Sequence, residues 1–361
     1  MPFLGLDISL RDTQMKHNLF SLIILIACAP LFLAGANSLH SDAQLFHKSE
    51  GTLLAFSRAS GYCISQGKWL DHIADKYPDL ASRAQLAQAE FELAFPEACK
   101  FMITFVASAM KTTVEAFEST LLDAMQAKSK EILPGDDSIP RDQAIEFIAT
   151  VLSRGKGNVE SPVFELLLAT SSTTRRSPAS ELSRGFFQPF NTKGHAKSLG
   201  ASVKMRIPRS WVAKEGDRPH VVQKWVEGAG FGRGIVLLMV MEPDSEAQIE
   251  WKVQLDRPDA CKVLFGGAHL TNISRARWFS IDGLPTVACE YEQTSTTAFG
   301  AIAMRSVSMM TFVENTPVVV QCSVSALASE SIDVPAMFSR ISMLCNAIST
   351  QIVFPAQYTS N

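Results

Sequence analysis

The sequence predicts an α+β protein, in which an N-terminal helical domain precedes an α/β/α sandwich with a mainly antiparallel sheet. In the first half of the chain, apolar residues recur at three- and four-residue steps, which is typical of amphipathic helices. In the second half, apolar and polar residues alternate with a period of two, as in half-buried strands. Between the halves, residues 171–184 are rich in Ser, Thr and Arg and lack an apolar period, so we expect a linker there.

The chain begins with a segment typical of a secretory signal peptide. Lys16 and His17 precede an almost wholly apolar stretch, residues 19–33, and the small residues Ala34-Gly35-Ala36 close it. A helix that crosses a bilayer needs about 20 apolar residues, more than this stretch supplies. We therefore expect residues 1–36 to be removed and the mature chain to begin near Asn37, with Met15 as a possible true start.

Two alternatives for this segment stay open. Leu25-Ile26-Ala27-Cys28 has the form of a lipoprotein box, although the residues after Cys28 remain apolar. The segment would act as a membrane anchor if it were not cleaved. We expect an exported protein, periplasmic or secreted, which contacts a membrane only if Cys28 is lipidated or the leader is retained.

Charge and cysteine content indicate which partners and which cellular compartment suit the protein. The 361 residues carry a net charge of −3 without a basic block, which argues against a nucleic-acid partner. Removal of the leader leaves six cysteines, an even number that permits disulfides in an oxidising compartment. Cys63 and Cys99 are disulfide candidates because both lie in the predicted helical domain, with buried free thiols as the alternative. The other four cysteines allow three pairings.

The predicted helical domain covers residues 37–170 and contains four to six helices. One continuous apolar stripe runs through Leu80, Ala84, Ala87, Phe91, Ala94, Ala98, Phe101 and Phe105. Pro96 lies inside this stripe and should kink or divide the helix. Further helices are expected over residues 114–124, 141–154 and 163–168.

The predicted sandwich covers residues 185–355, followed by a tail at 356–361. Val203, Met205 and Ile207 alternate with polar residues in its first strand. Further strands are expected at 220–227, 234–242, 268–278, 285–293, 300–313 and 317–325, and a helix at 245–255. A closing helix has the apolar stripe Phe338, Ile341, Cys345, Ile348 and Ile352. Consecutive strands with few intervening helices favour an antiparallel sheet covered by helices.

Four segments of the second half form a familiar set: Ile207-Pro208-Arg209-Ser210-Trp211, residues 214–225 (KEGDRPHVVQKW), Ile281-Asp282-Gly283-Leu284-Pro285 and residues 342–349 (SMLCNAIS). Together they resemble exported bacterial domains of the PsbP-like superfamily. The resemblance covers residues 185–355 and implies an α/β/α sandwich with a central antiparallel sheet. Superfamily members with known roles are mostly binding or assembly proteins. Examples are the extrinsic subunits of the photosynthetic oxygen-evolving complex. None of their functional residues has a convincing match in this sequence, so no functional residue is assigned from the resemblance.

The motifs associated with cofactors, metals or nucleophiles are weak. The run from Gly228 to Gly234 (GAGFGRG) is followed by a strand pattern, whereas a phosphate-binding loop needs a helix, so we expect a hairpin turn. The histidines form no HExxH pair, and no serine lies in a G-x-S-x-G elbow. Asp136 and Asp137 suit a turn better than a calcium site. We expect no cofactor, no metal and no catalytic residue that the sequence alone can name.

The segment from Lys214 to Lys224 is the candidate contact region for a ligand or partner. Its polar side chains gather around Pro219: Glu215, Asp217, Arg218, His220, Gln223 and Lys224. The alternative is a structural turn that leads into a strand with a solvated face. We expect an exported non-enzymatic binding or assembly protein, whose partner is an unknown protein or small ligand outside the cytoplasm.

The alternative function is an envelope or extracellular hydrolase with a site assembled from distant residues. A cleft lined by converging titratable groups would favour the enzyme. An apolar patch with a polar rim would favour the binding protein.

Overall fold

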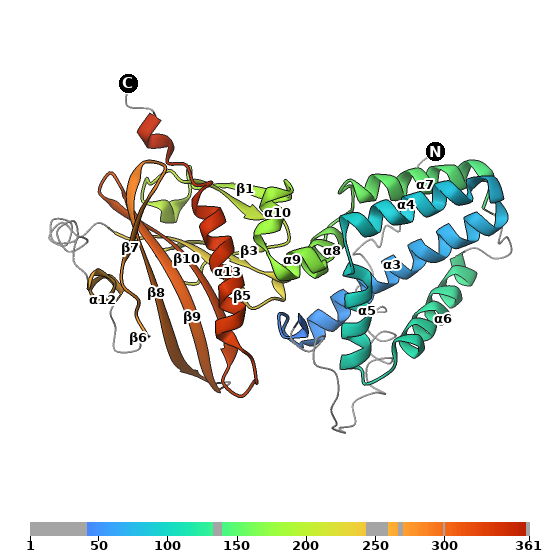
Figure 1. Cartoon of the computed structure of the whole chain (residues 1–361), viewed down its shortest axis with the longest axis horizontal. Helices are drawn as coiled ribbons and strands as arrows, with labels where there is room; N and C mark the ends of the chain where they lie inside the picture. The colour runs from blue at the N-terminus through green and yellow to red at the C-terminus, as the bar shows by residue number, and fades with distance from the viewer. Residues whose placement is uncertain (1–41, 133–138, 243–258, 266–269, 299, 359–361) are drawn as a thin grey trace. The chain divides into compact units, whose positions relative to one another are not determined.

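Helices come first in the chain and strands second, and the predicted α+β fold class is confirmed (Figure 1). The computed structural model describes residues 42–132, 139–242, 259–265, 270–298 and 300–358. All described elements belong to one unit, residues 41–361. The signal peptide expected at 1–36, the helix expected at 245–255 and the Asp136-Asp137 turn lie outside the described residues.

The described part of the first half contains six α-helices and one 3-10 helix. They are α3 (Glu50–Lys76), η1 (Pro78–Leu80), α4 (Ala81–Ala94), α5 (Ala98–Ala109), α6 (Val114–Ile132), α7 (Arg141–Gly155) and α8 (Val163–Thr170). The predicted apolar stripe is buried from Leu80 to Phe105 except for the partly buried Ala94. It is divided at Pro96, as expected, because Glu97 adopts a left-handed φ of 60° between α4 and α5. α4 packs against α7, and α3 against α5 (Figure 1).

A disulfide joins two of these helices. Cys63 on α3 is bonded to Cys99 on α5, with the Cα atoms 5.8 Å apart. Of the two states that the sequence left open for these cysteines, the structure therefore has the bridged one. Residues far apart along the chain are thereby covalently fixed side by side.

The segment expected to be a linker, 171–184, is folded. It forms two short helices, α9 (Ser172–Arg176) and α10 (Ala179–Ser183). Ser171 caps α9 by accepting a hydrogen bond from the backbone of Thr174, and Arg175 and Glu181 are buried. The polar residues of this segment are used for capping and for buried polar contacts, which explains its lack of an apolar period.

The second half is built on an eight-stranded sheet in the order β3-β4-β5-β10-β9-β8-β6, with β7 also paired to β8. Every pairing between these strands is antiparallel, as predicted. The strands are β3 (Val212–Lys214), β4 (Val221–Val226), β5 (Gly234–Val240), β6 (Leu270–Thr271), β7 (Arg277–Ile281), β8 (Leu284–Thr297), β9 (Gly300–Val313) and β10 (Thr316–Leu327).

One predicted strand was wrong. The single strand expected at 268–278 is interrupted between β6 and β7. Asn272 has a left-handed φ of 49°, and the hydroxyl of Ser274 accepts a hydrogen bond from the backbone of Glu290. The Ser274 backbone still donates to the Glu290 oxygen at 2.8 Å, so the hydroxyl takes the place of a backbone acceptor in the second hydrogen bond.

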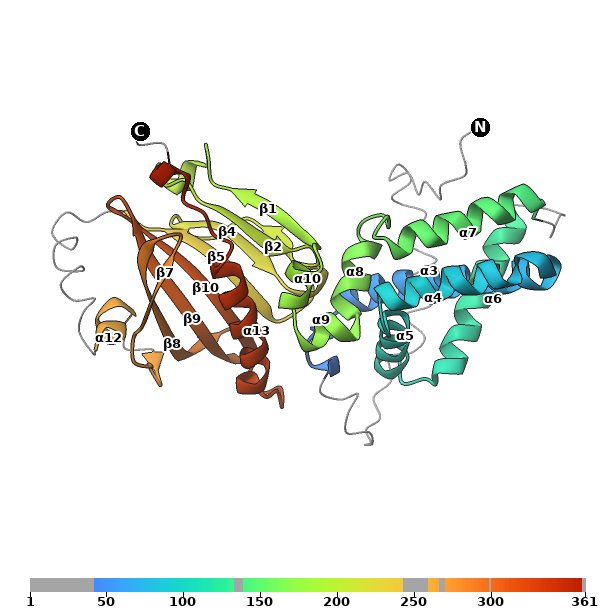
Figure 2. The same ribbon diagram turned by 45° about the horizontal axis from the view of Figure 1, so that its top comes forward.

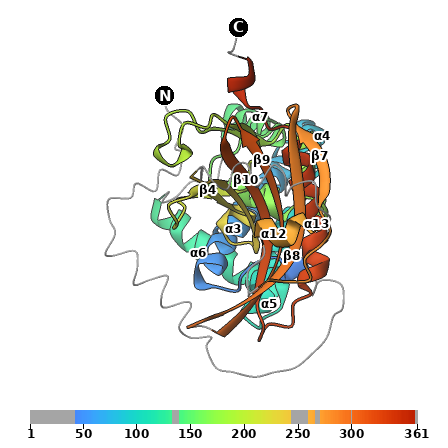
Figure 3. The ribbon, with the colours of Figure 1, turned by 90° about the vertical axis from the view of Figure 1, so that its left-hand side faces the viewer.

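Both faces of the sheet are covered, and the period of two assigns residues to each. Val318, Val320, Cys322 and Val324 of β10 share the face that packs under α13 (Val334–Ser349), to which the disulfide Cys322–Cys345 ties them. Val319 faces the opposite side, where a smaller apolar cluster includes Cys261 of α12 (Ala260–Phe265), bonded to Cys289 of β8. Figure 2 shows α13 along the sheet beside β9 and β10, and Figure 3 shows α12 in front of the strands.

A separate two-stranded ribbon completes the second half. β1 (Phe187–Asn191) pairs antiparallel with β2 (Lys204–Pro208). The chain returns to this ribbon after α13, because the backbones of Val353 and Lys204 exchange two hydrogen bonds of 2.8 and 2.9 Å. Of the residues expected as a C-terminal tail, those up to Tyr358 lie in a 3-10 helix, η4 (Pro355–Tyr358), whose Gln357 amide donates to the backbone oxygen of Asp282.

Candidate binding site

The six residues singled out from the sequence lie on the loop between β3 and β4 and on β4 itself. Glu215, Asp217 and Arg218 are exposed, whereas His220, Gln223 and Lys224 are half-buried. The Lys224 ammonium lies 4.0 Å from the Asp217 carboxylate, at the limit of an ion pair.

Contacts of the neighbouring backbone fix this loop in place. Lys197, in the 3-10 helix η2 (Ala196–Ser198), donates a hydrogen bond of 2.8 Å to the oxygen of Gly216. The Gln223 amide donates to the backbone oxygen of Lys224 at 3.1 Å. The structure therefore brings the side chains of Asp217 and Lys224 together. The side chains of the other four candidate residues do not converge on a shared point among the described residues.

The glycine-rich run forms a turn between two strands, as predicted. Residues Gly228–Gly230 make the 3-10 helix η3, and β5 follows from Gly234. Gly228 has a φ of 68°, and the ring of Phe46 fills the space that a side chain would need, since a Cβ there would lie 2.7 Å from the ring. The glycines thus serve close packing of backbone and side chains.

A hollow of about 680 Å³, open to solvent, lies against the β1–β2 ribbon and the end of α13. We call it the ribbon hollow, and it is lined by Pro189, Phe190, Asn191, Lys204, Met205, Arg206, Thr350, Gln351 and Val353. Its volume falls within the range of small-molecule sites, roughly 300–1,000 Å³.

The register of the ribbon explains which side chains reach this hollow. Pro189 is opposite Arg206 and Asn191 is opposite Lys204, so these four side chains share one face, and all four are exposed. Val353 extends the same face through its bridge to Lys204. Phe190 alternates to the other side, where it packs edge-on against Trp225 with ring centroids 4.9 Å apart. The lining thus rests on a packed core.

The charged groups of the ribbon hollow are of one sign. Lys204 and Arg206 are its only ionisable lining residues, and among the described residues neither forms an ion pair with an acidic side chain. The Arg206 guanidinium lies 4.4 Å from the ring centroid of Phe187, a cation–π contact that restricts its orientation. The buried side-chain oxygen of Gln351 has no hydrogen-bond partner among the described residues.

Converging titratable groups do occur elsewhere, but they are enclosed. Glu181 of α10 accepts hydrogen bonds from the Ser210 hydroxyl at 2.5 Å and the Ser210 backbone at 2.9 Å. Burial raises the pKa of Glu181 to about 7, against the opposing effect of the Ser210 hydrogen bonds. Ser210 is only 1% exposed and Glu181 0%, so no substrate in solvent can reach either group.

A second buried pair lies next to the first. The Arg340 guanidinium of α13 contacts the Glu227 carboxylate at 2.5 Å, and the side chains are 8% and 9% exposed. Glu227 also accepts a hydrogen bond of 3.1 Å from the backbone of Gly234. These contacts connect α13 to the turn between β4 and β5, so their role is structural.

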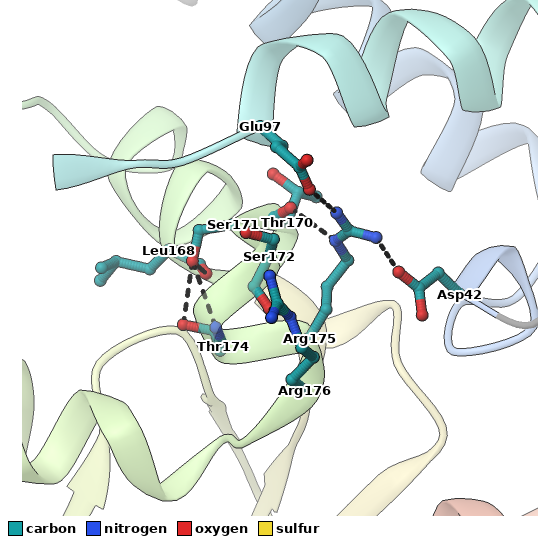
Figure 4. Close-up of polar contacts among 9 residues, drawn as sticks. All are labelled: Asp42, Glu97, Leu168, Thr170, Ser171, Ser172, Thr174, Arg175 and Arg176. Atoms are coloured by element: carbon teal, nitrogen blue, oxygen red, sulfur yellow. Dashed lines mark hydrogen bonds and ion pairs between the residues drawn. The ribbon is translucent and has the colours of Figure 1, made fainter. Parts of the chain in front are cut away.

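Arg175 anchors the folded linker to the first half of the chain (Figure 4). Its guanidinium forms ion pairs with Asp42 and with Glu97, the latter at 3.3 Å, and donates to the backbone oxygen of Thr170 at 2.9 Å. It also lies 4.2 Å from the ring centroid of Phe101. Each nitrogen of this buried guanidinium is thereby paired inside the protein.

The segment before α3 is held in a similar way. Arg233 makes two hydrogen bonds of 2.8 Å to Glu330 and one of 2.9 Å to the backbone oxygen of Gln44. Phe46 forms a β-bridge with Gly232. Burial, assisted by the nearby Arg233 charge, lowers the pKa of His47.

The described residues contain no group of three or more His, Cys, Asp or Glu side chains arranged to hold a metal ion. Among the described helices, none has both the length and the apolar character needed to cross a membrane.

The ribbon hollow was not predicted from the sequence. Its lining comes from two segments, around residues 189–206 and 350–353, and no motif connects them. The available signal was the pair of cations at Lys204 and Arg206, which alternate with buried residues on a strand that was correctly expected.

Comparison with known proteins gives limited similarity. No protein-family model and no curated protein matches the chain. One solved structure, from Bacteroides thetaiotaomicron, is similar to 42% of this chain with 11% identity and a TM-score of 0.25, and the match spans 44% of its own length. Another is LpqN of Mycobacterium tuberculosis, described as involved in cell envelope biogenesis. It matches over 49% of this chain and 96% of its own, with 13% identity and a TM-score of 0.28.

Proposed function

We propose that this chain is an exported, non-enzymatic binding or accessory protein that takes a small ligand outside the cytoplasm. Three disulfides support export, because such bonds persist in oxidising compartments. We also propose that residues 185–355 form a domain of the PsbP-like superfamily. The antiparallel sheet with helices on both faces supports this assignment.

The observation that carries the proposal is the ribbon hollow. It is concave and presents the apolar side chains of Pro189 and Val353 beside the polar side chains of Asn191, Lys204 and Arg206, a combination suited to a small ligand. The titratable groups that converge, around Glu181 and Glu227, are enclosed within the protein instead. The exposed side chains of Glu215, Asp217 and Arg218 remain a proposed second contact, for a protein partner.

The test is native mass spectrometry of the protein recovered from its own host. We expect the wild type to carry a non-covalent ligand that is absent from Val353→Trp. Val353 is 38% exposed and lines the hollow, so the larger ring fills the hollow without entering the core. Leu93→Trp, at a 76% exposed position on α4, is the matched control and should retain the ligand.

Two results would overturn the proposal. One is a wild-type protein with no bound molecule in any preparation from its host. The other is a ligand that persists in Val353→Trp, which would remove the hollow as its site. Circular dichroism of both variants checks that the fold is unchanged.

A further inference from the structure

The two cations of the ribbon hollow form a matched pair. Lys204 and Arg206 are two residues apart on β2, so their side chains leave the same face of the ribbon. Both are exposed, and none of the described residues that line the hollow is acidic. An unpaired cation pair at the rim of a concave site attracts an anion, and the planar guanidinium suits a carboxylate or phosphate group.

The remainder of the lining suits a different part of the same ligand. Pro189 and Val353 present apolar side chains beside the cations, whereas Phe190 and Met205 turn their side chains to the core and support this surface from behind. Removal of an alkyl chain from water onto such a surface is favourable by about 25 cal/mol for each Å² buried. The hollow therefore offers one charged end and one apolar surface to a single molecule.

We propose that the ribbon hollow binds a free single-chain anionic amphiphile. Lys204 and Arg206 hold its anionic head, and the apolar lining holds its chain. The hollow is concave and of small-molecule size, which favours a free molecule over the surface of a bilayer. This inference rests on the proposed binding function and adds the chemical class of the ligand.

Isothermal titration calorimetry of the exported, disulfide-bonded chain tests the inference. The probes are dodecanoate, dodecyltrimethylammonium and acetate, all below micelle-forming concentrations. We expect dodecanoate to bind roughly tenfold more tightly than the cationic amphiphile, because two exposed charge pairs each contribute modestly. Acetate should bind more weakly than dodecanoate because it lacks the chain.

A double variant isolates the contribution of the charges. Lys204→Gln with Arg206→Gln should bring the affinities for dodecanoate and dodecyltrimethylammonium to within roughly threefold of each other. Both side chains are exposed, so the fold should tolerate the change. The matched control, Arg83→Gln with Lys100→Gln, removes two exposed cations from α4 and α5 and should keep the preference for dodecanoate.

The outcomes separate this inference from the proposed function. Equal affinity for both amphiphiles, or a preference that survives the double variant at Lys204 and Arg206, overturns the anionic class. If Val353→Trp still loses the ligand acquired in the host, the binding function stands. Binding to vesicles of anionic phospholipid without binding of dodecanoate also overturns the inference, because the source would then be a bilayer. Weaker binding of dodecanoate at higher salt supports it.

Discussion

At the scale of single residues, the Glu181 carboxyl is enclosed completely and makes stability depend on pH. Its pKa is raised to about 7 in the folded protein, above its ordinary value of 4.5. Between these values the unfolded chain has released the proton while the folded protein retains it. Stability therefore falls as pH rises from about 4.5 to about 7 and then stays level with respect to this group.

Glu181→Gln should remove this dependence. The amide can still accept the backbone hydrogen bond from Ser210 and has no proton to lose. We expect the loss of unfolding free energy between pH 5 and pH 8, measured by urea denaturation, to be smaller in the variant by about 2–3 kcal/mol. Glu115→Gln, at an exposed position, is the control. Identical pH slopes for wild type and Glu181→Gln would refute the assignment.

Arg175 and Arg141 show how burial changes the contribution of an ion pair to the free energy of unfolding. The Arg175 side chain is 5% exposed and also satisfies the Thr170 carbonyl, whereas Arg141 pairs with Asp79 in solvent. Arg175→Met leaves that buried carbonyl without its donor, so we expect a loss of about 2–3 kcal/mol of unfolding free energy. Arg141→Met should produce no measurable change. Equal effects in urea denaturation would contradict this account.

At the scale of elements, the close packing at the start of β5, next to the buried Glu227–Arg340 pair, requires a glycine at position 234. A Cβ at Gly234 would lie 2.6 Å from the Glu227 carboxylate and 2.9 Å from Ile341 of α13. Gly234→Ala must displace one of these groups, so we expect a loss of about 1–3 kcal/mol of unfolding free energy.

A glycine in helix α3 has room for a side chain, in contrast to Gly234. Gly67 lies in its interior, where an added methyl group would have no atom within 4 Å, and its φ is not positive. Gly67→Ala should therefore raise stability by about 0.5–1 kcal/mol through helix propensity. Urea midpoints of the two variants give the comparison, and a stabilised Gly234→Ala protein would show that the turn is not tightly packed.

Periodicity predicted the elements whose burial is regular. The stripe from Phe338 to Ile348 lies in α13, and the alternation from Val318 to Val324 lies in β10, because each pattern repeats the geometry of its element. Asp333 caps α13 through the backbone of Ala336, as its position before Pro335 suggested.

Contacts between distant residues could not be predicted in this way. Arg175 in the expected linker has an ion pair with Asp42 that spans 133 residues. The ribbon hollow depends on the return of Val353 to Lys204, which no local pattern encodes. The candidate loop at 215–220 was conspicuous in composition, and its end is a turn closed by a 3.1 Å hydrogen bond from the backbone of Val221 to that of Arg218.

At the scale of the whole molecule, three disulfides link elements in both halves of the chain. Cys63–Cys99 joins α3 to α5, Cys261–Cys289 joins α12 to β8, and Cys322–Cys345 joins β10 to α13. Each bridge restricts the unfolded chain and so stabilises the folded one, typically by about 2–4 kcal/mol. Such bonds form and persist in oxidising compartments, so the three disulfides are consistent with export.

The intact mass of the protein from its native host tests this connection. We expect a chain that begins near Asn37 and whose mass increases on reduction by two hydrogens for each of three disulfides. Reduction should also lower the urea midpoint, because the closed loops of the unfolded chain are released. A mass that retains the apolar segment, or that begins at a lipidated Cys28, would instead describe a membrane-tethered protein. The ribbon hollow would then meet its ligand at the membrane surface rather than in free solution.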